Sequence, residues 1–211
     1  MSTKDTEFTI KNGILYEYRG DSSKIVIPNG VTKIASSALK EKNLEEVIIP
    51  DTVIEIGSFA FSKNNLSSII IPESVEIIGD FAFNNNRIKY AWLSEGVKTI
   101  GDYAFYHNQI TQLILPDTLE EIGCNAFNSN KIKKIMIPSK IKVIKNGAFL
   151  LNELDTVIFS DDIEKIQEEA FKYNKIKNCF FMGKVESIDN TSFDTNTKRY
   201  VKKKVGVDVN E

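Results

Sequence analysis

Residues 64–85 read NNLSSIIIPESVEIIGDFAFNN, and this stretch decides the fold because its pattern recurs along the chain. The five prolines mark the recurrence, since every gap between them is 22 residues or twice 22. They are Pro28, Pro50, Pro72, Pro116 and Pro138. Ser94, Ser160 and Met182 continue the same phase, so eight copies run from Lys24 to Arg199 without an insertion. Repetition at a fixed period of about 20–50 residues is the signature of a solenoid.

The other positions of the repeat confirm this phase. The unit is N-x-[LI]-x-x-[IV]-x-[IL]-P-x-x-[VL]-x-x-I-G-x-x-A-F-x-x. The period of two in Ser68–Pro72 predicts a strand with Ile69 and Ile71 inside and Ile70 outside, which the proline ends. A second extended piece, Val75–Ile78 in this copy, is expected to line the opposite wall, and the Ala-Phe pair to form a tight helical turn with Phe at the centre. The asparagine column predicts an inward amide ladder that bonds the backbone of the turns. Its members are Asn64, Asn86, Asn108, Asn130, Asn152, Asn174 and Asn196.

This unit resembles the BspA-type leucine-rich repeat, a class of about 22–23 residues found in bacterial cell-surface and secreted proteins, over about five-sixths of the chain. Tyr18-Arg19-Gly20 ahead of Ile27-Pro28 is similar to the N-terminal run of the family, whereas asparagine stands where that class often carries cysteine. The resemblance implies a leucine-rich-repeat solenoid, a right-handed arc of parallel β rungs with short helical turns that is mostly β and loop. It also implies an extracellular or cell-surface location and a role in adhesion or ligand capture.

Composition agrees with a soluble globular chain. The 211 residues are 42 % hydrophobic and 27 % charged, and the net charge of −2 favours neither nucleic acid nor an anionic membrane as partner. No apolar run reaches the roughly 18 residues needed to span a bilayer. Two cysteines, Cys124 and Cys179, cannot make a disulfide scaffold; Cys179 occupies an inward strand position and Cys124 an exposed one.

The repeat divides the chain into three parts. Residues 1–23 are expected to form a capping hairpin around Asn12-Gly13, a strong hairpin signal. Residues 24–199 hold the eight repeats, and residues 200–211 form a C-terminal tail or partial cap in which Tyr200 and Val201 close the last rung. The first residues lack the apolar core of a signal peptide, so we expect either a signal removed from this chain or a cytoplasmic protein, and the resemblance favours the first.

The strongest candidate site is the outward strand position, because all eight of its residues are apolar although they should face solvent. This apolar stripe consists of Val26, Ile48, Ile70, Trp92, Ile114, Met136, Ile158 and Phe180. At about 4.8 Å per rung it runs roughly 34 Å along the expected concave sheet, and exposed patches of that scale usually mark binding sites. Tyr90 beside Trp92 completes the best hot-spot candidate. The neighbouring outward column, which begins with Lys24 and Glu46, is mixed and polar, and it is expected to form the rim of this site.

Three readings of the stripe stay open. Ile and Val have high strand propensity, so an apolar ladder can simply stabilise neighbouring rungs. The stripe can also bind a protein ligand, a host or extracellular-matrix protein being one candidate, or a second copy of the chain. Finally, another part of the chain can cover it.

A second candidate patch lies at the Ala-Phe corner. Phe59, Phe81 and Tyr103 precede the alanine in three successive repeats, and Tyr106 and His107 follow in the third. Such rings can stack on each other for local stability, which is the simpler interpretation, or form a secondary contact surface.

The sequence contains little that indicates catalysis or metal binding. With a single histidine and no Cys-x-x-Cys pair, the sequence predicts no metal site, no cofactor and no enzymatic activity. Arg19-Gly20-Asp21 matches the integrin-recognition tripeptide, but its glycine already serves the turn. The basic run from Lys198 to Lys204 is typical of a solvated end. The sequence therefore predicts a protein-binding or adhesion module, with a spacer or dimerisation module of a larger surface protein as the alternative.

Overall fold

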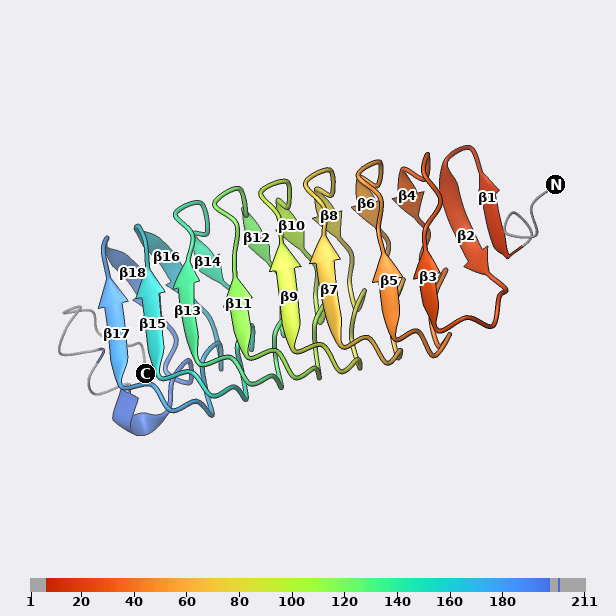
Figure 1. Ribbon diagram of the computed structural model, residues 1–211. Coiled ribbons are helices and arrows are strands. Elements are labelled where there is room, and N and C mark those ends of the chain that lie inside the picture. Colours follow the sequence, from red (N-terminus) through yellow and green to blue (C-terminus); the bar gives the residue numbers. More distant parts are fainter. Residues whose placement is uncertain (1–6, 198–200, 202–211) are drawn as a thin grey trace.

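The computed structural model describes residues 7–197 and 201, and it is a solenoid of two β walls (Figure 1). Each repeat contributes one strand to a front wall and one to a back wall. The front-wall strands are β3 (Lys24–Val26), β5 (Glu46–Ile48), β7 (Ser68–Ile71), β9 (Tyr90–Leu93), β11 (Gln112–Ile114), β13 (Lys134–Ile137), β15 (Thr156–Phe159) and β17 (Asn178–Phe181). The back-wall strands are β4 (Lys33–Ile34), β6 (Glu55–Ile56), β8 (Ile77–Ile78), β10 (Thr99–Ile100), β12 (Glu121–Ile122), β14 (Val143–Ile144), β16 (Ile163–Ile166) and β18 (Val185–Ile188).

Neighbouring rungs pair in parallel, with a register of one repeat. Ser68 lies opposite Tyr90, and Ile70 lies opposite Trp92. The back wall holds a seven-stranded sheet, β1-β2-β4-β6-β8-β10-β12, and a three-stranded sheet, β14-β16-β18. The front wall holds β3-β5, β7-β9-β11 and β13-β15-β17. Equivalent positions of successive repeats therefore lie in straight rows along the molecule.

A β-hairpin precedes the first rung, as Asn12-Gly13 predicted. Strands β1 (Phe8–Lys11) and β2 (Ile14–Tyr18) pair antiparallel, and Asn12 and Gly13 both adopt the positive φ that a two-residue turn of this kind requires. Strand β2 then pairs in parallel with β4, so the hairpin extends the back wall. At the other end Val201 is buried, whereas Tyr200 lies outside the described residues.

The back-wall strands are shorter than the sequence predicted in most rungs. The expected extended piece from Val75 to Ile78 is reduced to Ile77–Ile78, because the Val75 amide still donates to the Pro72 carbonyl at 3.1 Å and closes a turn. In the seventh rung the Ile163 amide instead donates to Lys184 of the next rung at 2.8 Å, and β16 keeps four residues.

The corner differs from the expected helical turn. Ala60 N donates to Gly57 O at 3.2 Å and Ser62 N donates to Phe59 O at 3.1 Å, so the corner is a pair of tight turns. Phe59 has φ +60°, outside the right-handed helical region, and its amide donates to Asp80 O of the next rung at 2.8 Å. Bonding between rungs thus replaces bonding along a helix. Of the described residues, only 195–197 and 201 have helical conformation.

The core is one continuous cluster whose centre is a column of phenylalanine rings. Phe61, Phe83, Phe105, Phe127, Phe149 and Phe171 are all fully buried, and Phe193 is almost so. Successive rings in this column stack nearly parallel, with centroids from 5.0 to 5.5 Å apart. The small residue before each ring, alanine in six rungs and Ser192 before Phe193, is buried as well, which lets the rungs approach this closely.

The asparagine ladder forms over six of its seven members. The Asn108 Oδ1 accepts from the Ile88 amide at 3.1 Å, while its Nδ2 donates to the carbonyls of Phe83 at 2.9 Å and Phe105 at 3.1 Å. Each rung is thereby tied to the one before it. The same pattern recurs at Asn64, Asn86, Asn130, Asn152 and Asn174.

The seventh member, Asn196, is exposed, so the prediction that it joins the inward amide ladder is wrong. Residues 195–197 leave the repeat geometry for a helical conformation, so the amide no longer points inward. The Asp194 carboxylate caps the rung below in its place, accepting from the amides of Tyr173 at 3.2 Å and Asn174 at 3.1 Å.

Candidate functional site: the exposed face of the front wall

The apolar stripe lies on the outer face of the front wall. Three of its central members are largely solvent-exposed: Ile70 at 68 %, Trp92 at 65 % and Ile114 at 72 %. Val26, Ile48, Met136 and Phe180 are exposed too, whereas Ile158, between Met136 and Phe180 in the adjacent strands, is half-buried. Alternate residues of the same strands, such as Ile69 and Ile71, are buried in the core. The stripe is therefore surplus to the core, and none of the described residues covers its central part.

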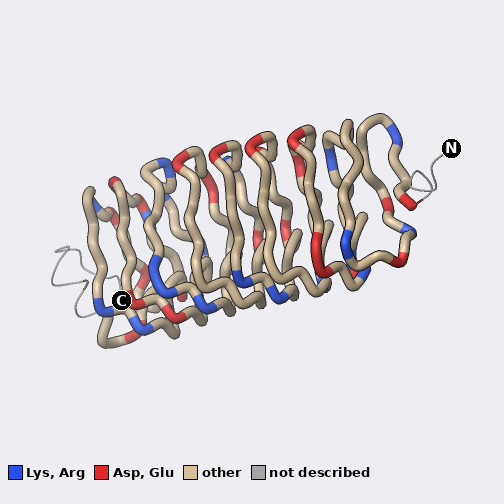
Figure 2. The backbone as a smooth tube through the Cα atoms, in the orientation of Figure 1, with Lys and Arg blue, Asp and Glu red and all other residues tan. Residues whose placement is uncertain are grey.

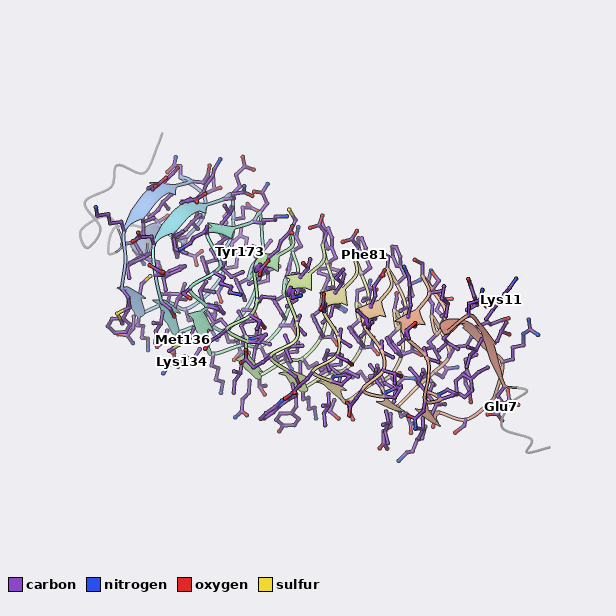
Figure 3. The ribbon with its side chains drawn as sticks, turned by 90° about the horizontal axis from the view of Figure 1, so that it is seen from above. Glu7, Lys11, Phe81, Lys134, Met136 and Tyr173 are labelled. Carbon is purple, nitrogen blue, oxygen red and sulfur yellow. The ribbon has the colours of Figure 1, made fainter. Side chains whose placement is uncertain are left out.

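A shallow hollow marks the middle of the stripe. It has a volume of about 540 Å³, and Ile70, Trp92, Ile114 and the exposed Tyr90 are in its lining. The rim column keeps its polar character, with an ion pair between Lys24 and Glu46 at 3.4 Å. In Figure 3, Met136 and the rim residue Lys134 lie together on one side of the coil, away from Phe81. The structure thus brings the residues predicted for ligand binding onto one surface.

Sequence reasoning missed a row of carboxylates that flanks this surface. Asp51, Glu73, Glu95 and Asp117 follow the proline position in four successive repeats, and all four are exposed. We call them the acidic row. Glu73 and Glu95 belong to the lining of the same hollow as Trp92. The repeat phase contained the signal, since all four carboxylates directly follow the proline position.

The corner patch is a stack rather than an open platform. Phe59 lies 4.7 Å from Phe81, and Phe81 lies 4.7 Å from Tyr103, all nearly parallel and half-buried. Tyr106 meets Tyr103 edge-on, and the exposed His107 lies beside Tyr106. Because the ring faces cover one another, this arrangement favours stacking between rungs; a contact role for the patch stays a prediction.

The residue types that could bind a metal or react are scattered over the part of the chain that the structure describes. No three His, Cys, Asp or Glu among them are placed to hold a metal ion. Neither cysteine is in a disulfide: Cys179 is buried, and Cys124 is half-buried, not exposed as predicted. Within Arg19-Gly20-Asp21, a Cβ on Gly20 would lie 2.5 Å from the Tyr18 hydroxyl, so the glycine serves packing, and Arg19 pairs with Glu17 at 2.7 Å.

Cys124 is expected to be a slow nucleophile. Burial raises the pKa of its thiol, and the nearby Asp102 carboxylate raises it further, so the thiolate fraction at neutral pH is below that of a free cysteine. Alkylation with iodoacetamide, followed by mass spectrometry, should therefore be slower at Cys124 than in a cysteine peptide and should accelerate only at higher pH. Cys179 should react only after unfolding. Rapid labelling of Cys124 at pH 7 would contradict this environment.

The family described as “BspA type Leucine rich repeat region (6 copies)” matches residues 9–111 and 76–199. No curated protein matches the chain. Of the helices in the described residues, none has the length and apolarity to cross a membrane.

Two solved structures share the fold. The T. pallidum leucine-rich repeat protein TpLRR is 20 % identical, with a TM-score of 0.68, over 100 % of this chain and 97 % of that one. The pneumococcal vaccine antigen PcpA is 19 % identical, with a TM-score of 0.56, over 81 % of this chain and 51 % of that one. At these identities the likeness shows the fold alone.

Proposed function

Because the chain belongs to the BspA-type leucine-rich repeat family, we propose that it is a non-enzymatic module that binds a protein ligand on its front wall. Leucine-rich repeats generally mediate protein interactions, and the stripe supplies a surface for one. The proposal includes adhesion or ligand capture outside the cell or at a bacterial surface, a location that the family membership favours.

The exposure of the stripe carries this proposal. Ile70, Trp92 and Ile114 leave most of their surface to solvent although the neighbouring positions fill a complete core. Threonine also has a high strand propensity and would expose less apolar area than Ile or Trp, so strand propensity alone does not explain the apolar residues of the stripe. Contiguous apolar surface on a soluble chain is costly unless a partner removes it from water. The exposed indole of Trp92 beside Tyr90 has the composition of a binding hot spot.

A double substitution tests the stripe. Trp92→Ala with Ile114→Ser should weaken capture of a protein ligand from extracellular-matrix extract by about 30-fold or more, the effect of losing one hot spot of about 2 kcal/mol. The thermal midpoint should change little because both side chains are exposed. Affinity is measured on the captured ligand by surface plasmon resonance.

The back wall offers a matched control. Ile54 and Ile77 are exposed at 50 % and 43 %, so Ile54→Ser with Ile77→Ser removes similar apolar area from the opposite wall and should leave capture intact. Capture that survives the stripe variant would rule out the front wall as the site. Light scattering addresses the alternative function, since concentration-dependent dimers that the stripe variant abolishes would identify a self-association module.

A further inference from the structure

The two edges of the front wall, one on each side of the stripe, carry side chains of opposite charge. The acidic row lies at the ends of the front strands, where Figure 2 shows red at the tips of successive coils. Basic side chains gather at the starts of β9 and β13, on the opposite edge of the wall, where the same figure shows blue, whereas carboxylates stand at the starts of β5 and β15. This basic edge comprises Arg87 and Lys89 before β9 and Lys131, Lys133 and Lys134 at β13, all exposed. The stripe residues Trp92, Ile114 and Met136 run between the two edges.

Folding does not account for this charge pattern. Elsewhere, charges on neighbouring rungs pair with each other, as in Lys33–Glu55 at 2.8 Å and Lys98–Glu76 at 3.0 Å. Among the ion pairs of the described residues, none includes a member of the acidic row or of the basic edge. The members of the acidic row lie in the turns after the front strands, one rung apart, where like charges repel one another. The acidic row is therefore a cost to the fold, and a complementary ligand would offset it.

The spacing of the rungs selects the form of the ligand. Hydrogen-bonded strands lie about 4.8 Å apart, and the rings of Phe159 and Phe181 on two front-wall strands stack with their centroids 4.6 Å apart. One turn of an α-helix advances about 5.4 Å, so a helix lying along the stripe drifts by about 0.6 Å per rung and places close to one apolar residue on each of four rungs. Residues on one face of an extended strand are about 6.6 Å apart and lose register within two or three rungs.

The width of the face agrees with a helix. Glu95 in the acidic row is six positions after Lys89 on the basic edge, which corresponds to at most about 20 Å of extended chain. A helix with its side chains is about 10–12 Å across, so it fits between the edges and its flanks come within reach of both.

We infer that the ligand presents an amphipathic α-helix to the stripe, with Lys or Arg along the flank that faces the acidic row and Asp or Glu along the flank that faces the basic edge. Its apolar side packs on Ile70, Trp92, Ile114 and Met136, one residue per turn. This inference rests on the proposed function and specifies the partner of the same surface.

Three stapled helical peptides with one apolar face test the inference. The first carries Lys on one flank and Glu on the other, the second Lys on both, and the third Glu on both. The first should bind at least about tenfold tighter than the others, because each single-sign helix meets one repulsive edge. Its affinity should fall as salt is raised. Isothermal titration calorimetry measures all three.

Charge reversal in the protein sharpens this test. Glu73→Lys with Glu95→Lys leaves two negative and two positive charges in the acidic row, so the helix with Lys on one flank should lose its advantage over the helix with Glu on both flanks. Glu164→Lys with Glu186→Lys changes the net charge equally on exposed positions of the back wall and should leave the original order unchanged. An order that ignores Glu73→Lys with Glu95→Lys, or that follows net charge alone, would overturn the inference.

Two further results separate this inference from the proposed function. If matrix capture depends on Trp92 and Ile114 but none of the helices binds, the helix is wrong and the protein-binding surface stands. If light scattering shows dimers that Trp92→Ala with Ile114→Ser dissociates, a second front wall is the occupant and the helix is likewise wrong. Capture unaffected by the stripe variant would remove both proposals.

Discussion

Replacing Asn108 with alanine is expected to lower the free energy of unfolding by about 3–5 kcal/mol, although it deletes only a small polar group. The amide makes three short bonds, with the Ile88 amide and with the carbonyls of Phe83 and Phe105. Alanine leaves the buried Ile88 amide without its partner, which costs about 1–3 kcal/mol. The Phe83 and Phe105 carbonyls keep the amides of Asn86 and Asn130, so each loses one of two bonds, which adds about 1 kcal/mol apiece. Urea denaturation followed by circular dichroism measures the change.

The same substitution at the last repeat gives a matched control. Asn196 occupies the equivalent position in the sequence but is exposed, so Asn196→Ala should change the unfolding free energy by less than about 0.5 kcal/mol. Equal losses for the two variants would contradict the placement of Asn196. A negligible loss at Asn108 would show that water replaces the ladder.

Phe105→Ala is expected to cost about 3–5 kcal/mol, in the range for buried aromatic truncations. The ring is fully buried between Phe83 at 5.2 Å and Phe127 at 5.3 Å, so its removal opens a cavity in the centre of the solenoid. Because stability in repeat proteins is carried by interfaces between neighbours, a central defect weakens two of them. Hydrogen exchange should therefore accelerate most around the third to fifth repeats.

Two other aromatic truncations serve as controls for Phe105→Ala. Phe193 stacks on Phe171 at 5.3 Å at the end of the column, so Phe193→Ala should cost roughly half as much as Phe105→Ala. Trp92→Ala removes a larger ring from an exposed position and should change stability little. A larger loss for Trp92→Ala than for Phe105→Ala would mean that the stripe serves the fold instead of a ligand.

The sequence was sufficient for most of the candidate site because the stripe depends on strand alternation within one repeat. Ile70 follows the buried Ile69, so its outward direction can be predicted from neighbouring residues. The exceptions arise where another part of the structure intervenes. Ile158 is half-buried between its neighbours Met136 and Phe180, and Cys124 is half-buried rather than exposed.

Local geometry in the turns was harder to predict. Phe59, Phe81 and Tyr103 all have positive φ, which bulky residues adopt rarely, so no propensity indicates it. Their amides bond the next rung, and their rings stack with one another, which offsets the strain. The partition into residues 1–23, 24–199 and 200–211 stays a prediction.

The amino-acid sequence by itself determined the repeat, the parallel pairing of its strands, the phenylalanine column and the inward direction of most asparagines. These follow from a 22-residue period that places like residues in register. Only the tertiary structure decided that Asp194 replaces Asn196 as a cap, and that the acidic row and basic edge border the stripe with no ion pair to another described residue. The physical reason is that charge interactions depend on distances between rungs and on side-chain direction, which residues 22 apart in the chain do not reveal.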